Sequence, residues 1–187
     1  MDTEVSKNNE QVSESPAMTL ASEKPFDEHM KDVEKRKLEQ EWKNEIKEEA
    51  SEYEITEFDR SLLRSIDNIK DEHDKELALI GFSFPFSSFK DKSRKRSGYD
   101  GIEQLAIEYA NRGDKDASIA DFFREKYGDN LYDFTNEPSR TRGIIALEDA
   151  ERYLSVPEEE RENDGEFMFI ADSLEFSKQV LARSKGE

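Results

Sequence analysis

The stretch TEFDRSLLRSIDNIKDEHDKELALI, residues 56–80, decides the fold class of this chain. Its apolar residues and one histidine recur mostly at steps of three and four, the spacing of one α-helical face: Phe58, Leu62, Ile66, Ile69, His73, Leu77 and Ile80. The Thr56 hydroxyl can cap the first turn, and Asp59 occupies the reciprocal position of a capping box. Gly81 follows, and glycine commonly ends a helix. We therefore predict a single helix over 57–80.

The chain beyond residue 99 repeats this helical pattern. We expect four further helices, over about 100–113, 116–128, 144–157 and 166–183. Asp116 is the expected cap of the second of them, and Gly128 its end. Residues 129–143 read as an irregular connection, and no strand pattern appears. The sequence therefore predicts an all-α protein, with an acidic domain of about five helices over 56–187.

Residues 26–53 also have helical spacing, in a segment dense in Glu and Lys. This pattern predicts one long amphipathic helix, and residues 26–55 are interpreted as a helical arm preceding the domain. Trp42 either anchors the arm on the domain or binds a partner protein, because tryptophan is enriched at interface hot spots. Pairing of this helix with another chain is a further alternative. The candidate partner-binding residues are Met30, Trp42, Ile46 and Tyr53.

An aromatic stretch and a basic stretch meet at residues 82–96. FSFPFSSF, residues 82–89, is expected to be an extended loop, because Pro85 argues against a central strand. Nucleic-acid or ribonucleoprotein binding is one interpretation, since bases stack on rings while phosphates pair with cations. Contact with an acidic protein or a membrane surface, a nuclear import signal and a solvated basic turn are the others. The candidate contacts are Phe84, Phe86, Lys90, Lys92, Arg94, Lys95 and Arg96.

Composition excludes several classes of protein. The 187 residues include 46 acidic and 28 basic side chains, a net charge of −18, and no cysteine, so disulfide scaffolds, zinc fingers and thiol catalysis are excluded. Residues 1–25 have no sustained apolar period and are expected to be a disordered tail. No run is apolar enough for a membrane span, and the N-terminus does not resemble a signal peptide. We expect a cytoplasmic protein, with the nucleus as an alternative.

No motif for catalysis or metal binding stands out. Residues 114–125 match some oxygen positions of a calcium loop, but Ile119 stands where that loop needs glycine. His29 and His73 have acidic neighbours and no nucleophile in a recognisable order, so both are interpreted as helix residues. Carboxylates are too frequent for their closeness in the sequence to indicate acid–base chemistry. We predict no cofactor, no metal and no catalytic residue.

The sequence therefore favours a non-catalytic acidic interaction protein: an adaptor, an assembly factor or an inhibitor. It would bind a protein partner through the helix at 26–53 or through its acidic face. One alternative is a DNA mimic that inhibits a DNA-binding protein, because residues 99–187 alone carry a net charge of −11. Nucleic-acid contact through 82–96 is a second alternative. An enzyme whose scattered carboxylates meet only in three dimensions is a third.

Overall fold

The computed structural model describes residues 26–84, 101–161 and 167–186. The all-α class predicted from the sequence is confirmed, since these ranges contain no strand. Six α-helices, rather than about five, follow the first one in the described part of the chain. None of these helices has both the length and the apolar character that a membrane crossing requires. The elements are α1 (Phe26–Glu52), α2 (Glu57–Asp67), α3 (Glu72–Ser83), α4 (Ile102–Ala110), α5 (Ile119–Tyr127), α6 (Pro138–Leu154), the short 3₁₀ helix η1 (Glu158–Glu160) and α7 (Met168–Lys185).

Helix α2 begins with the predicted capping box. The Asp59 N–H donates to the Thr56 hydroxyl at 3.1 Å, and the Thr56 N–H donates to the Asp59 carboxylate at 3.1 Å. A second helix, α3, starts after Asp71, whose carboxylate accepts a hydrogen bond from the Asp74 N–H at 2.8 Å. The prediction of a single helix over 57–80 is therefore wrong. An aspartate is better at capping free backbone N–H groups than at continuing a helix, and Asp71 does the former.

Gly81 lies inside α3 rather than at its end. A Cβ atom on this residue would lie 3.5 Å from the Ala106 Cβ and 3.6 Å from the Glu103 Cα of α4. The space between the two helices would accept a methyl group and little more, so glycine here serves close packing. The expectation of an extended segment from residue 82 is wrong for Phe82 and Ser83, which are helical.

Two later helices start elsewhere than the sequence predicts, and one ends as predicted. The Ser118 hydroxyl accepts a hydrogen bond from the Asp121 N–H at 3.1 Å, so Ser118 caps α5 and Asp116 does not. Helix α5 ends at Gly128, whose φ of 95° suits glycine, as predicted. Helix α6 begins at Pro138, inside the stretch expected to be irregular. Proline is favourable there because the first turn needs no N–H donor and its fixed φ suits a helix.

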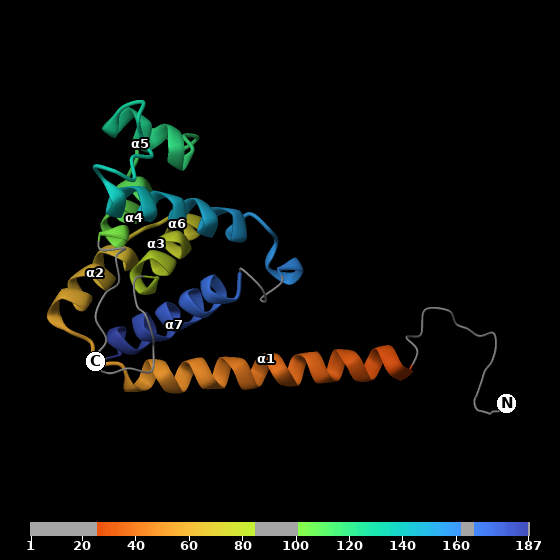
Figure 1. The fold of residues 1–187 in the computed structure, drawn as a ribbon. Helices are drawn as coiled ribbons and strands as arrows, with labels where there is room; N and C mark the ends of the chain where they lie inside the picture. Colours follow the sequence, from red (N-terminus) through yellow and green to blue (C-terminus); the bar gives the residue numbers. More distant parts are fainter. Residues whose placement is uncertain (1–25, 85–100, 162–166, 187) are drawn as a thin grey trace. The chain divides into compact units, whose positions relative to one another are not determined.

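Helix α3 is the central helix of the core, and it packs against α2, α4, α6 and α7 (Figure 1). Its Leu77, Ile80 and Phe82 side chains are completely buried. Burying one side chain of this size contributes about 1.5–3 kcal/mol to stability. Further buried side chains from the surrounding helices complete the core: Ile66, Ile102, Ile144, Leu147, Phe176 and Val180.

Helix α1 is shared between two compact units. Residues 44–187 form one unit, called the domain below, so the boundary falls within α1 and not after residue 55. Within the domain, Ile46 and Ala50 are buried. The Arg183 guanidinium of α7 donates to the carbonyl oxygens of Ala50 and Tyr53 at 2.7 and 2.6 Å. These bonds satisfy carbonyls near the end of α1, where the helix itself provides no donor. From here on, the arm means residues 26–43 alone, a shorter segment than the helical arm of 26–55 predicted from the sequence.

Candidate functional site

The arm carries exposed apolar side chains. Met30 is 41% exposed, Val33 40% and Leu38 66%, whereas Trp42 is half-buried. None of the side chains at 27–43 is buried. A helix of this length with mixed charges is only marginally stable when isolated, and most protein helices are stabilised by burying an apolar face. The arm is therefore a helical stretch, within the part of the chain that the structure describes, whose apolar side chains are available to a partner.

The apolar residues of the arm do not form the single stripe predicted from the sequence. An α-helix turns about 100° per residue, so the five-residue step from Val33 to Leu38 turns about 500°, or about 140° past a full turn. Relative to Met30 at 0°, Val33 lies at about −60°, Leu38 at about 80° and Trp42 at about 120° around the helix axis. The four side chains are therefore spread over about 180° of the helix surface.

Ile46 and Tyr53, the other two candidate partner-binding residues, belong to the core of the domain. Ile46 is 4% exposed and Tyr53 9%. The Tyr53 hydroxyl donates to the Asp59 carboxylate at 2.7 Å, and its ring packs edge-on against Phe176 with centroids 5.6 Å apart. Both side chains are occupied by the domain's own packing, so the prediction of partner binding now rests on Met30 and Trp42.

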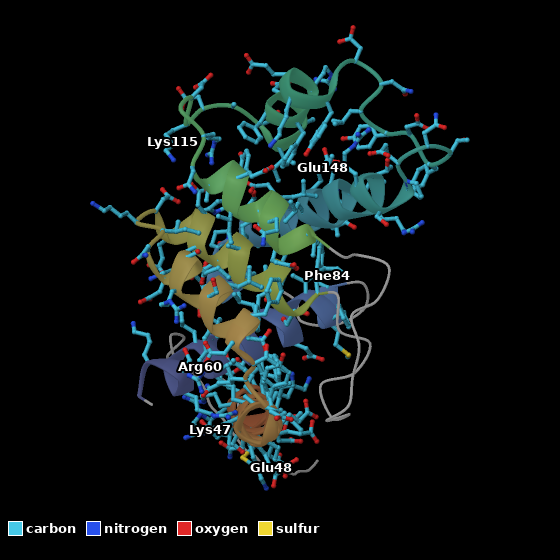
Figure 2. All side chains as sticks on the ribbon, turned by 90° about the vertical axis from the view of Figure 1, so that its left-hand side faces the viewer. Lys47, Glu48, Arg60, Phe84, Lys115 and Glu148 are labelled. Atoms are coloured by element: carbon cyan, nitrogen blue, oxygen red, sulfur yellow. The ribbon has the colours of Figure 1, made fainter. Side chains whose placement is uncertain are left out.

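Phe84 is the one described member of the aromatic and basic candidates. It is half-buried and lies just beyond α3, where Figure 2 labels it. Its ring packs edge-on against Phe169 of α7 with centroids 5.1 Å apart. Phe82, two residues earlier, is completely buried and cannot stack on a base. The remaining candidates lie outside the described residues and stay predictions: Phe86, Lys90, Lys92, Arg94, Lys95 and Arg96.

A group of exposed and half-buried apolar side chains that the sequence reasoning missed lies around Phe167, at the start of α7. Its members, called the aromatic corner, are Phe84, Val156, Phe167, Met168 and Phe169. Met168 and Phe169 are 51% and 40% exposed. Two shallow hollows of about 190 and 130 Å³ meet at Phe167. Clustered exposed apolar residues of this kind often mark protein-binding surfaces.

The sequence did contain a signal for this corner. Phe167, Met168 and Phe169 are consecutive, and successive helix positions differ by about 100° around the axis. Three consecutive apolar residues at the start of a helix therefore cannot all face the core. In α7 the next residue, Ile170, is the one that is buried.

Ion pairs connect α3 to neighbouring elements, and two of them involve His73 and Asp74. The His73 Nε2 lies 2.9 Å from both carboxylate oxygens of Glu151 on α6. This hydrogen bond raises the pKa of His73, although partial burial opposes the rise. The buried Asp74 carboxylate lies 3.2 Å from the Arg112 guanidinium, which also stacks over the Tyr109 ring at 3.8 Å. Both pairs hold helices together.

In the described part of the chain, no group of three or more Asp, Glu or His side chains is placed so that it could hold a metal ion. Asp114, the first residue of the calcium-loop-like stretch, uses its carboxylate to accept a hydrogen bond from the Asp116 N–H at 3.0 Å. Comparison with known protein families, with curated proteins and with solved structures finds no match. Function is therefore inferred from the residues of this chain alone.

Proposed function

We propose that this protein is a non-catalytic interaction protein that binds a protein partner through the arm. The observation that carries the proposal is the exposure of Met30, Val33 and Leu38 on a helical stretch that buries none of its own side chains. Full burial of one such side chain on a partner would contribute about 1.5–3 kcal/mol. An adaptor, an assembly factor and an inhibitor all fit this mode of binding.

The angular spread of the arm's apolar side chains constrains the shape of the site that we propose on the partner. A helix that lies in a simple groove presents anchors at positions such as i, i+3, i+4 and i+7 on one face. Val33 and Trp42 lie about 180° apart around the helix axis, with Met30 and Leu38 between them, so one groove wall cannot reach all four side chains. The partner we propose encloses the arm, as a helix is enclosed in a bundle. Trp42 is the expected hot spot of that contact.

The proposal is tested by comparing two arm variants in a pull-down with nuclease treatment at two salt concentrations. The triple variant Met30→Gln, Val33→Gln and Leu38→Gln removes the exposed apolar groups and keeps residues that favour a helix. The control, Glu34→Gln with Lys35→Gln, changes the same helix without changing its apolar faces or its net charge. We expect a nuclease-resistant partner to be retained by the control and lost by the triple variant. Equal retention by both variants would contradict the proposal.

The two nucleic-acid alternatives have less support among the described residues. Three acidic side chains on the domain pair with arginines three residues along the helix: Asp121 with Arg124, Glu137 with Arg140, and Asp149 with Arg152. Each arginine interrupts the row of negative charge that a DNA mimic needs. Nucleic-acid contact through 82–96 rests mainly on residues outside the described ranges. Partner binding that disappears with nuclease in every variant would favour this second alternative.

A second copy of the chain is the remaining alternative for the arm. Helix pairing between copies would bury the same side chains, Met30, Val33 and Leu38. Light scattering of the purified protein distinguishes the cases, because pairing between copies raises the mass with concentration. In that case the triple variant would have a smaller mass than the unmodified protein at the same concentration.

A further inference from the structure

A groove in the domain is lined by more basic than acidic side chains. It lies between α2 and α7 and has a volume of about 300 Å³. Arg60, which Figure 2 labels on α2, lines it together with Arg64 one helical turn later and Lys185 of α7. Asp67 is the only carboxylate among its lining residues. Three cations thus face one acid, in a chain whose net charge is −18.

The single carboxylate of the groove is already held by lysines. The Asp67 Oδ1 atom lies 3.3 Å from the Lys185 Nζ and 3.4 Å from the Lys75 Nζ. Although burial acts to raise the pKa of Asp67, hydrogen bonds and charge from these two lysines leave it lowered. Arg64, in contrast, is exposed and has no ion-pair partner among the described residues. A negatively charged ligand would therefore find the arginine side of the groove attractive.

Apolar side chains also line the groove. Leu63 is 1% exposed and Leu181 is half-buried. A lining that combines cations with apolar side chains suits a ligand that combines carboxylates with an apolar side chain. A nucleic-acid strand suits it less, because the overall negative field of the protein repels a polyanion.

We propose that this groove binds an acidic segment of a partner protein, with a carboxylate on Arg64 and an apolar side chain beside Leu181. Arginine is well adapted to this role, since its planar guanidinium can donate two parallel hydrogen bonds to one carboxylate. The site is separate from the arm and does not depend on the proposed function. Loss of either interaction can be observed while the other remains.

The test is a titration of the full-length, isotope-labelled protein, followed through its amide NMR signals. The probe is a fluorescein-labelled peptide of glutamate, aspartate and leucine. A peptide with glutamine and asparagine in place of the acids is the control. An oligothymidylate and inorganic phosphate are titrated separately as two further ligands. We expect the acidic peptide to shift signals of residues 60–67 and 181–185, with an affinity that falls as salt is raised. No shifts there, or tighter binding of the oligothymidylate, would overturn the proposal.

Matched charge reversals locate the contact. Arg64→Glu is expected to weaken binding of the acidic peptide at least about tenfold, because it removes a charge-assisted contact and adds repulsion. Arg142→Glu makes the same change in net charge at an exposed position of α6 and is expected to weaken binding less than about twofold. Equal weakening by both variants would mean that the probe senses only the overall charge, and the groove would be rejected. Thermal unfolding of both variants checks that the fold is retained.

Discussion

The arm and α3 differ in how completely they bury apolar side chains. Leu77, Ile80 and Phe82 of α3 are completely buried, whereas Met30 and Leu38 of the arm are 41% and 66% exposed. Charged residues are eleven of the eighteen in the arm and four of the twelve in α3, where none follows Glu76. The apolar side chains of the arm spread over about 180° around the helix axis, whereas α3 is surrounded by four other helices of the domain. Burial of a helical segment therefore depends on the elements packed around it as well as on its own apolar spacing.

The largest expected effect is the loss of Phe82. Phe82→Ala should lower the free energy of unfolding by about 3–5 kcal/mol, because it removes a completely buried ring and leaves a cavity in the core. Val33→Ala in the arm should change it by less than about 0.5 kcal/mol. Chemical denaturation followed by circular dichroism measures both. Similar effects of the two substitutions would remove the difference between the arm and the domain.

A second pair of substitutions sharpens the boundary inside α1. Ile46→Ala should lower the free energy of unfolding by about 2–4 kcal/mol, since Ile46 is 4% exposed within the domain. Leu38→Ala, two turns earlier, should change it by less than about 0.5 kcal/mol. The same denaturation experiment applies. A large effect of Leu38→Ala would place the boundary nearer to the N-terminus than residue 44.

The features of the fold that the sequence predicted are those that depend on neighbouring residues. Thr56 and Asp59 form their capping box within one turn, and Gly128 ends α5 through its own φ. Gly81 was misjudged because its role depends on Ala106, which is distant in the sequence and close in space. Local patterns cannot reveal such a contact. The helix break at Asp71 is different, since its capping potential was visible but the continuing apolar spacing was given more weight.

The candidate functional site also depends on contacts between residues that are distant in the sequence, which local patterns do not reveal. Met30 is 41% exposed and Trp42 is half-buried, and their role in partner binding stays a prediction. Ile46 and Tyr53 continue the same spacing, and only their contacts with the domain, such as that between Tyr53 and Phe176, separate them from the other two. The groove between α2 and α7 could not be predicted at all. Arg64 and Lys185 are far apart in the sequence, and the packing of two helices brings them together.

A smaller effect is expected from the cap that separates α2 and α3. Asp71→Ala should lower the free energy of unfolding by about 1 kcal/mol, because the Asp74 N–H loses its acceptor. Asp71→Asn keeps an acceptor and should cost less. If Asp71→Ala leaves stability unchanged, the start of α3 is determined by packing alone.

The smallest expected effect is a dependence of stability on pH that arises in the domain and not in the arm. The hydrogen bond from Glu151 raises the pKa of His73 in the folded state, so folding stabilises the protonated imidazole. This contribution is complete below the unfolded pKa of about 6.5 and is lost as the pH rises through the higher folded pKa. Both side chains are more than a third exposed, which limits the effect to less than about 1 kcal/mol.

The measurement for this last prediction is the denaturation midpoint at about pH 6 and about pH 8. His73→Gln should reduce the difference between the two midpoints, because it removes the titrating partner of Glu151. His29→Gln, at an exposed position in the arm, should leave the difference as it is in the unmodified protein. An unchanged difference in His73→Gln would mean that other groups of the domain determine its pH dependence. A reduced difference in His29→Gln would instead mean that the arm shares in the domain's stability, contrary to the division at residue 44.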